Sequence, residues 1–431
     1  MNKNVNKETT SNNYIPKVVV VGAGASGILA SIVIKRALGE NVDIIILERL
    51  EKIGKKILAS GNGRCNFTNE LMSNSKFNNP DFVYHLFKRF GYSETIAFFE
   101  ELGLLSKVLT EGRTYPVTEN ATSVLDVLRL ELDYLGVKVR TSFEVKKIAV
   151  ADKKYVLTSL KDEEGLADYV ILSTGGKASP VLGSNGSGYS ILKPFDINIK
   201  KQYPGLVGLK TDKNIFKSLD GIRVKANLKI KDKKTNQVYW NEDGEVLFKS
   251  DGLSGIVSMQ ASSYLNRKER SISSYVISLD MLSNMKNEEI YRYIDKKMVM
   301  YPEVSMEFLL TGLLNKMIAL KILKDNKIEL SRLIKTLTVK EKDKIVNNIK
   351  NYIVDIKNTY DFDKAQVTIG GVDVSEVKKE TLELKKLKNV YVIGELLDID
   401  GECGGYNLQW AWTSGYIAGS DVVKKIGVKY E

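Results

Sequence analysis

Three glycines at a fixed spacing follow a run of valines near the start of the chain. Residues 22–27 read Gly-Ala-Gly-Ala-Ser-Gly and fit the pattern G-x-G-x-x-G, between a β-branched run at 17–21 and a helical pattern. In such a junction the first glycine permits a tight turn, the second lets the backbone approach a pyrophosphate, and the third allows close packing of helix on strand. Unpaired N–H groups and the dipole of the helix start attract the phosphates. The motif predicts a dinucleotide site that includes Gly22, Ala23, Gly24, Ser26 and Gly27.

An acidic residue ends the next predicted strand, at residues 42–48. Glu48 lies a little beyond the interval of roughly 20 residues at which a carboxylate binds the ribose of an adenosine. A carboxylate at this place repels a ribose phosphate. Arg49 beside it fits either a 2′-phosphate, as in NADP, or a side chain that faces solvent. A glycine turn that binds nothing is the structural alternative for the whole unit.

A second glycine-bearing junction lies near the end of the chain. Residues 390–395 read as a buried strand that enters a turn, and Asp398, Asp400 and the glycines at 404–405 precede a helical pattern. Such a helix start would direct N–H groups at the pyrimidine edge of a flavin, where negative charge develops on reduction. A flavoprotein needs this second, remote set of contacts, so the chain is expected to bind FAD. A plain turn between strand and helix is the alternative.

Residues 60–66, Ser-Gly-Asn-Gly-Arg-Cys-Asn, combine hydrogen-bond donors with backbone freedom. We expect this loop to line the flavin ring or the substrate entrance through Asn62, Arg64 and Cys65, with Arg64 as the partner of an anion. Arg64 forming a salt bridge to a loop acid, and Cys65 being a small buried residue, are the alternatives.

Periodicity places these residues on an α/β framework. Helical spacing is found at 81–105 and at 119–136, where Thr118 is the expected N-cap, and short strands are expected between 137 and 173. The stretch 203–280 is β-rich, and 284–353 is helical with a long amphipathic run at 307–323. Strands return at 366–371 and 390–394, followed by a helix at about 406–425.

This order predicts an α/β fold in which a Rossmann-type FAD-binding domain, of the glutathione-reductase type, is interrupted by an insert. The expected parts are a disordered tail at 1–16, a first part of the FAD domain at 17–202, an insert at 203–354 and the second part at 355–431. Within the insert, a β-barrel, with a sandwich as the alternative, is expected over about 203–282 and helices over about 283–354.

Composition excludes several classes of protein. No apolar run approaches the roughly 20 residues of a membrane span, and the polar N-terminus lacks a signal sequence, so a cytoplasmic location is expected. Cys65 and Cys403 have no metal or disulfide spacing, and with the single His85 no metal site is expected. The chain holds 64 Lys and Arg against 53 Asp and Glu. The basic residues interleave with acidic ones, as they do on faces exposed to solvent, so no nucleic-acid partner is expected.

The chain resembles a group of bacterial flavoproteins, the family that includes aminoacetone oxidase and flavin-dependent dehydro-bile-acid reductases. The resemblance covers nearly the whole chain. Beside the N-terminal fingerprint it rests on the segments 52–69, 112–121, 173–189, 244–255, 366–372 and 394–415.

The resemblance implies an FAD domain interrupted by a β-barrel and a helical part, and it assigns cofactor contacts. Besides Gly22, Gly24, Ser26, Gly27 and Glu48, these contacts are Thr174, Gly175, Gly176, Gly394, Glu395, Asp400, Gly405, Tyr406 and Asn407. Further cofactor contacts are expected at Ala23, Arg49, Lys55, Asn62 and Gly63. The chain departs from the family at Asn62, where glycine is common, at Lys249-Ser250 in place of Thr-His, and near Phe195-Asp196. The last two changes concern the choice of substrate.

The expected activity is hydride transfer between flavin N5 and a small organic or steroid-like molecule, with NAD(P)H as a transient electron donor. One alternative is an amine oxidase of the aminoacetone type, which makes peroxide. The other is a flavin-bearing redox sensor or an RNA-associated binding protein, to which the net charge of +11 points. Substrate and oligomeric state stay open.

Overall fold

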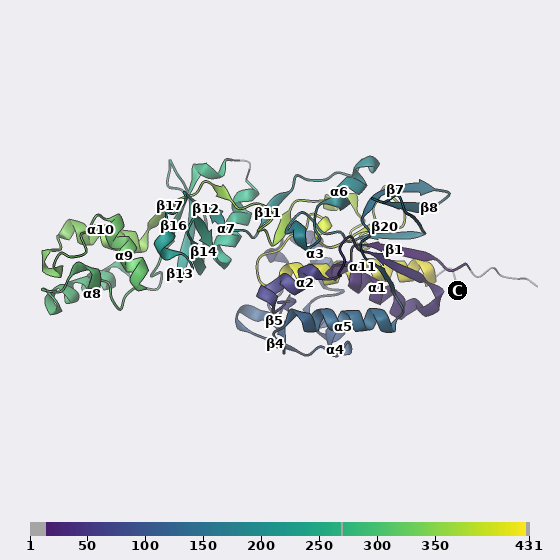
Figure 1. The fold of residues 1–431 in the computed structure, drawn as a ribbon, viewed down its shortest axis with the longest axis horizontal. Coiled ribbons are helices and arrows are strands. Elements are labelled where there is room, and N and C mark those ends of the chain that lie inside the picture. Colours follow the sequence, from purple (N-terminus) through teal and green to yellow (C-terminus); the bar gives the residue numbers. More distant parts are fainter. Residues whose placement is uncertain (1–13, 269, 428–431) are drawn as a thin grey trace, which may run out of the picture. The chain divides into compact units, whose positions relative to one another are not determined.

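The computed structural model describes residues 14–268 and 270–427, and its contacts divide the chain into two compact units (Figure 1). The first unit takes in the residues up to Gly176, 181–201 and those from Gly370 onward, and the second takes in 177–180 and 202–369. Of the tail expected at 1–16, residues 1–13 lie outside the described residues. Tyr14 is described, and its hydroxyl donates to Asp168 at 2.5 Å.

A five-stranded parallel sheet forms the centre of the first unit. Its strand order is β20-β10-β1-β2-β6, with β1 at Lys17–Val21, β2 at Asp43–Leu47, β6 at Lys138–Arg140, β10 at Tyr169–Leu172 and β20 at Val390–Val392. Residues 18–21 are all buried, because both faces of a parallel sheet are covered. The expected Rossmann-type unit, with β10 and β20 returning to the first strands, is confirmed.

Two helices that start at the glycine junctions pack against each other. They are α1 at Ala25–Leu38 and α11 at Tyr406–Gly427. A methyl group at Gly415 would lie 2.5 Å from the carbonyl oxygen of Ser26, and one at Gly419 would lie 3.1 Å from that of Ala30. Glycines on α11 therefore permit the close approach of the two helices. The helix expected at 406–425 is confirmed.

The remaining elements of the first unit surround this centre. The helices are α2 at Lys55–Ala59, α3 at Pro80–Phe87, α4 at Tyr92–Glu101, α5 at Ala121–Tyr134 and α6 at Ser187–Leu192. One small sheet has the order β3-β5-β4, at Thr68–Asn69, Arg113–Pro116 and Ser106–Val108, and a meander comprises β7 at Val145–Ala151, β8 at Lys154–Ser159 and β9 at Glu164–Ala167.

Two helix predictions in this unit are wrong in detail. The segment 81–105 is two helices, because the chain is extended at Gly91, whose N–H is accepted by the Glu94 carboxylate. The N-cap of α5 is Asn120 and not Thr118, since Glu119 has a left-handed φ of 48° that no helix accommodates. The Asn120 side chain accepts the N–H of Thr122 at 2.9 Å.

The second unit is built on a seven-stranded antiparallel sheet in the order β17-β16-β13-β14-β15-β12-β18. The strands are β12 at Leu209–Lys210, β13 at Arg223–Asp232, β14 at Val238–Lys249, β15 at Gly252–Ser254, β16 at Tyr275–Asp280, β17 at Tyr352–Asp355 and β18 at Asn358–Thr359. A separate pair joins β11 at Tyr203–Gly205 to β19 at Val367–Ile369. The helices are α7 at Ile256–Asn266, α8 at Asn287–Met300, α9 at Lys316–Asp325 and α10 at Val339–Lys350, and the last three cluster together (Figure 1).

The insert differs from expectation in four respects. The described pairings do not join β17 to β18, so the expected barrel is an open sheet here. The edge strand β18 and its neighbour β12 have two residues each, which is too few to extend the pairing.

Helix α7 interrupts the β-rich stretch. Most of its residues are buried, so it lacks an amphipathic pattern. The run 307–323 is broken at Gly312, with a φ of 89°. Strands β17 and β18 pair within the insert, whose contacts extend to Ile369 and not to 354.

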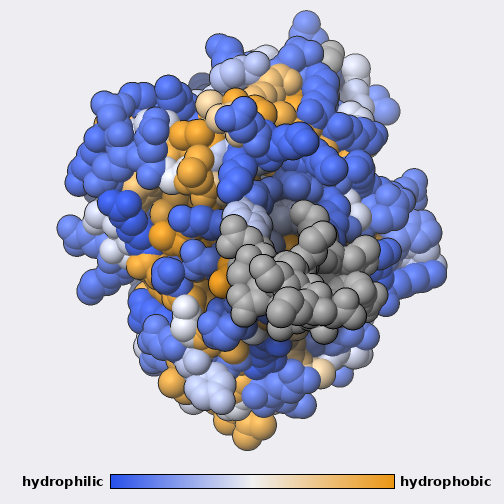
Figure 2. All heavy atoms as spheres, turned by 90° about the vertical axis from the view of Figure 1, so that its right-hand side faces the viewer, coloured by the Kyte–Doolittle hydropathy of each residue, from blue (hydrophilic) through white to orange (hydrophobic). Residues whose placement is uncertain are grey.

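The surface is predominantly polar on the face shown in Figure 2, where hydrophilic residues surround a band of hydrophobic ones. Among the helices of the described residues, none combines the length and the apolar character that a membrane crossing requires.

Candidate functional site

The glycines of the first junction have three different surroundings. A methyl group at Gly22 would lie 2.5 Å from the Ser173 carbonyl oxygen, and one at Gly27 would lie 2.2 Å from the carbonyl oxygen of Gly22. These two positions therefore serve the turn and the packing of α1 on the sheet. At Gly24 a methyl group would meet no atom within 4 Å, so the backbone before α1 faces open space. This is the room that a diphosphate needs at a helix N-terminus.

The Glu48 carboxylate holds this junction in shape. One oxygen accepts the N–H of Ala23 at 2.8 Å and the other accepts that of Leu50 at 2.9 Å, and the side chain is buried. A carboxylate oxygen has further lone pairs, so two ribose hydroxyls can still donate to it. Arg49 instead forms an ion pair with Glu144 at 3.3 Å, which neutralises the charge that a 2′-phosphate would require.

The two glycine-bearing junctions meet. A methyl group at Gly394, which has a left-handed φ of 64°, would lie 2.6 Å from the hydroxyl oxygen of Ser26. The Gly394 turn is fixed from α11, because Ser414 accepts its N–H at 2.9 Å and Trp410 donates to its carbonyl oxygen at 3.0 Å. The strand ends after β1 and β20 thus lie at one edge of the sheet, which is where parallel α/β sheets bind their ligands.

The start of α11 lies against the segment that follows the 60–66 loop. A methyl group at Gly405 would lie 2.4 Å from the Thr68 carbonyl oxygen, and the Trp412 indole donates to the carbonyl oxygen of Phe67 at 2.9 Å. From this start, about 14 Å of helix lead to Gly415 beside Ser26. One elongated edge therefore carries both junctions, as a dinucleotide requires.

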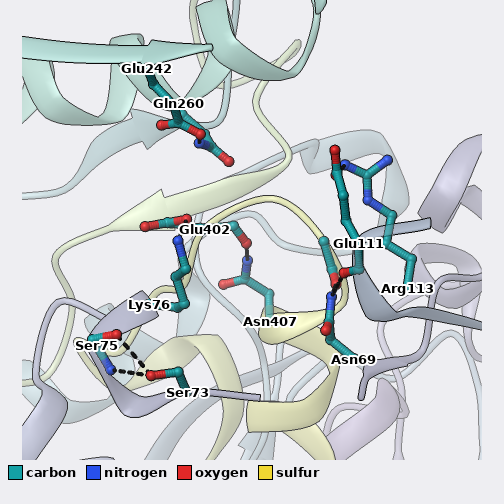
Figure 3. A network of polar contacts seen from close by, with 11 residues as sticks. Asn69, Ser73, Ser75, Lys76, Glu111, Arg113, Glu242, Gln260, Glu402 and Asn407 are labelled. Atoms are coloured by element: carbon teal, nitrogen blue, oxygen red, sulfur yellow. Dashed lines mark hydrogen bonds and ion pairs between the residues drawn. The ribbon is translucent and has the colours of Figure 1, made fainter. Parts of the chain in front are cut away.

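Of the predicted ring contacts, Asn407 has hydrogen-bond partners within the chain (Figure 3). The Asn407 amide accepts the N–H of Gly401 and donates to its carbonyl oxygen, both at 2.9 Å, so a contact of this residue with a flavin would use its backbone N–H. Tyr406 is buried, and burial raises the pKa of its hydroxyl. Asn69 donates to the Gly404 carbonyl oxygen at 2.8 Å and so fixes the glycines before the helix.

The turn after β10 is packed tightly. Gly175 has a φ of 70°, and a methyl group on it would lie 2.6 Å from the Ser184 hydroxyl oxygen. The carbonyl oxygen of Gly176 accepts the N–H of Gly186 at 3.0 Å. Thr174 lies next to Gly188, where a methyl group would be 2.1 Å from its hydroxyl oxygen. The predicted residues 174–176 therefore lie at the carboxyl edge of the sheet, beside the Gly394 turn.

The 60–66 loop is only partly suited to the roles expected of it. Asn62 and Gly63 are exposed, whereas the Arg64 guanidinium pairs with Glu119 at 3.1 Å and stacks on the Tyr115 ring. Cys65 is fully buried, and burial raises the pKa of its thiol to about 12, so the thiol is protonated at neutral pH. Both observations agree with the alternatives, a salt bridge for Arg64 and a buried small residue for Cys65.

Sequence reasoning missed several residues that shape the edge. Lys55 lies at the start of α2, but its neighbour Lys56 makes the ion pair with Glu395, at 2.6 Å. Asp398 is bound by Lys200 at 2.8 Å and by the Asn78 amide at 3.0 Å, whereas the predicted Asp400 is held through its N–H by Asn78. Lys56 and Asp398 lie in the segments 52–69 and 394–415 that the sequence singled out, whereas Asn78 and Lys200 lie outside them. The choice between adjacent lysines requires the structure.

The residues described here hold no cluster of three or more His, Cys, Asp or Glu side chains that could bind a metal. The family model for the HI0933-like protein Rossmann domain matches residues 16–421, which is nearly the whole chain. The chain belongs to the HI0933-like family. It is an FAD-dependent oxidoreductase, and the open space before Gly24, the Glu48 carboxylate and the paired glycine junctions fit FAD.

Two curated proteins are similar to this chain over nearly its full length. A 3-dehydro-bile acid delta(4,6)-reductase of Clostridium scindens is 36% identical over 94% of this chain and 98% of its own. A ribosomal RNA dihydrouridine synthase of Escherichia coli is 28% identical over 94% and 97%. Among solved structures, a 3-ketosteroid-delta4-(5alpha)-dehydrogenase of Rhodococcus jostii shares 14% identity with a TM-score of 0.47, over 96% of this chain and 99% of its own.

Proposed function

We propose that the protein reduces a carbon–carbon double bond conjugated to a carbonyl group. The supporting observation is the 36% identity, over nearly both chains, to a protein named as a 3-dehydro-bile acid delta(4,6)-reductase. The FAD-binding edge described above agrees with a flavin reaction. FAD, when bound, supplies a hydride from N5 of its reduced ring. In such a reduction the hydride would add at the carbon β to the carbonyl and a proton at the α carbon, so both electrons would enter the double bond.

The chain's own residues bind and orient the cofactor for this reaction. The backbone around Gly24 and the start of α1 receive the diphosphate, and the Glu48 carboxylate accepts from the adenosine ribose. Residues 394–400 flank the ribityl and phosphate portion, and the backbone N–H groups at the start of α11 stabilise the charge that develops on the reduced ring. In this proposal residues 174–176 pass close to the cofactor and residues 62–63 border the substrate entrance.

An anaerobic titration tests the activity. The purified yellow protein, bleached with NADH or NADPH, should regain its colour when a steroid with a 3-keto-4,6-diene is added, with loss of the dienone absorbance. If the reduced protein regains its colour only with oxygen, and an amine then yields peroxide, the protein is an amine oxidase and the proposal is wrong.

A second candidate substrate is a uridine within RNA, whose C5=C6 bond is also conjugated to a carbonyl. The charge distribution favours it, since residues 202–369 hold 29 Lys and Arg against 21 Asp and Glu, while the rest of the chain holds 35 against 32. Most of the excess positive charge thus belongs to the insert, which suits a polyanionic substrate. Two relatives of 28% and 29% identity are named as ribosomal RNA dihydrouridine synthases.

The same reduced protein distinguishes the two substrates. Ribosomal RNA lacking dihydrouridine should reoxidise the flavin and gain dihydrouridine, detected by mass analysis of its nucleosides, if RNA is the substrate. Reoxidation by the dienone alone identifies the small-molecule reductase. Reoxidation by neither excludes both substrates.

A further inference from the structure

One buried tyrosine hydroxyl lies beside the FAD-binding edge. Tyr189 on α6 is 7% exposed, and within the described part of the chain its hydroxyl oxygen has no hydrogen-bond partner. An unsatisfied polar group in the interior is costly, so buried hydroxyls normally find a partner in the protein, in water or in a ligand. Something outside the polypeptide is therefore expected to bind this hydroxyl.

The start of α6 is held between two strand ends that form this edge. A methyl group on Gly188 would lie 2.1 Å from the Thr174 hydroxyl oxygen and 2.8 Å from the Leu396 side chain. Thr174 follows β10 and Leu396 follows β20, and these strands are neighbours in the parallel sheet. Tyr189 thus follows directly after Gly188, where the turns after β10 and β20 meet at the FAD-binding edge.

The charges around the hydroxyl determine what it can bind. Burial, with the negative charges of Glu395 and Asp398, raises the pKa of Tyr189, so the group stays protonated and can donate. Both carboxylates already have cationic partners, Lys56 and Lys200, at 2.6 and 2.8 Å. The hydroxyl is a neutral donor beside the segment 394–400, which is proposed above to flank the ribityl and phosphate portion.

We infer that the Tyr189 hydroxyl donates a hydrogen bond to an oxygen of the ribityl–phosphate portion of FAD, as a positioning residue for the cofactor. The hydroxyl is buried in advance, so no side chain has to be ordered when FAD binds. The inference depends on FAD binding alone and not on the identity of the substrate.

Tyr189→Phe tests this inference on the full chain. A lost neutral hydrogen bond should raise the dissociation constant for FAD about 3- to 10-fold, measured by quenching of flavin fluorescence in the apoprotein. The apoprotein itself should unfold at the same or a higher urea concentration than the wild type, because the variant removes an unsatisfied buried group.

Tyr155→Phe is the matched control. The Tyr155 hydroxyl donates to the Lys388 carbonyl oxygen at 2.6 Å in the same unit, so this variant should lose apoprotein stability and keep its affinity for FAD. Two results would overturn the inference: an unchanged FAD dissociation constant in Tyr189→Phe, or an apoprotein that loses stability or fails to fold, since the hydroxyl would then have a partner inside the protein.

Discussion

At the scale of single residues, the surroundings of each group at the FAD-binding edge determine its role. The three glycines of residues 22–27 differ in what surrounds them, and only Gly24 borders open space. Glu48 is a buried carboxylate that accepts two backbone N–H groups, so it shapes the turn before any ribose arrives. The thiol of Cys65 is also buried, but burial raises its pKa and keeps it neutral, so it carries no charge at this edge.

We expect Glu48→Gln to weaken FAD binding and to destabilise the apoprotein. The amide has one acceptor oxygen, so either the N–H of Ala23 or that of Leu50 loses its partner, at a cost of about 1–3 kcal/mol. Urea unfolding and FAD titration measure the two effects. Glu51→Gln, at an exposed position three residues away, should change neither, and an equal effect of both variants would refute the assigned role.

The two cysteines should differ in reactivity. In the native protein at pH 8, Cys65 should not react with a thiol reagent, whereas Cys403, which is partly exposed, should react. Unfolding should release the second thiol, and Cys403→Ser should abolish the native reaction. Two thiols reacting at the same rate in the native protein would contradict the burial of Cys65.

The raised pKa of Cys65 also links stability to alkaline pH. The folded thiol has a pKa of about 12 against an ordinary value of 9.0, so above pH 9 the unfolded chain releases a proton that the folded chain retains. The contribution of this thiol is fully present below pH 9 and is lost as the pH rises toward 12. Cys65→Ala should flatten this part of a plot of unfolding free energy against pH.

At the scale of elements, the site depends on the contact between α1 and α11. Gly415 lets the α11 backbone approach Ser26, and the same helix fixes the Gly394 turn through Trp410 and Ser414. The position of one helix therefore sets the geometry of both junctions.

We expect Gly415→Ala to displace α11 from α1 and so to disturb both glycine junctions. Its methyl group would lie 2.5 Å from the backbone of Ser26, where no flexible side chain can yield, so we expect a loss of about 1–3 kcal/mol of stability together with weaker FAD binding. Gly427→Ala, in the same helix, meets no atom within 4 Å and serves as the control. Thermal unfolding with and without FAD measures both.

The sequence pattern predicts most elements near the site, and it fails where a single backbone angle decides. The valines at 18–21, the glycine spacing and the apolar run at 390–393 identify the parallel strands without ambiguity, because buried strands have a clear composition. The left-handed Glu119 and Gly312 break helical patterns that look continuous. Which lysine meets Glu395 depends on helix phase, which a five-residue helix does not reveal.

At the scale of the whole molecule, two compact units have separate cores and separate charge. One core is built around the parallel sheet, and the other around the antiparallel sheet and helices of the insert. The first unit contains every residue assigned here to FAD, whereas the second contains most of the excess positive charge. The division separates cofactor binding from the part in which Lys249 and Ser250 depart from the family.

Calorimetry should show FAD stabilising one unit selectively. A ligand that binds only the folded form raises the transition of the unit that binds it, by about 2.7 kcal/mol at a hundredfold excess over its dissociation constant. We expect FAD to raise the melting temperature of a transition assigned to the first unit and to leave that of the second. In Glu48→Gln the rise in melting temperature that FAD causes should be smaller. An equal rise in both transitions would contradict the assignment of FAD binding to the first unit.

RNA affinity should depend on where the positive charge lies. If RNA is the substrate, Lys225→Glu with Lys229→Glu on β13 should lower binding of ribosomal RNA at least tenfold and reduce its salt dependence. Lys147→Glu with Lys161→Glu, on the meander of the first unit, changes the net charge equally and should have a small effect. Equal losses would show that net charge alone governs binding.

The first unit is assembled from segments at both ends of the chain, and this has a consequence for its biosynthesis. A ribosome makes Gly22, Glu48 and Thr174 early, yet Gly394 and the helix that starts at Tyr406 emerge only after the entire insert has been translated. During most of translation the nascent protein therefore has only the N-terminal part of its FAD-binding edge. The complete site for FAD can form only near the end of translation.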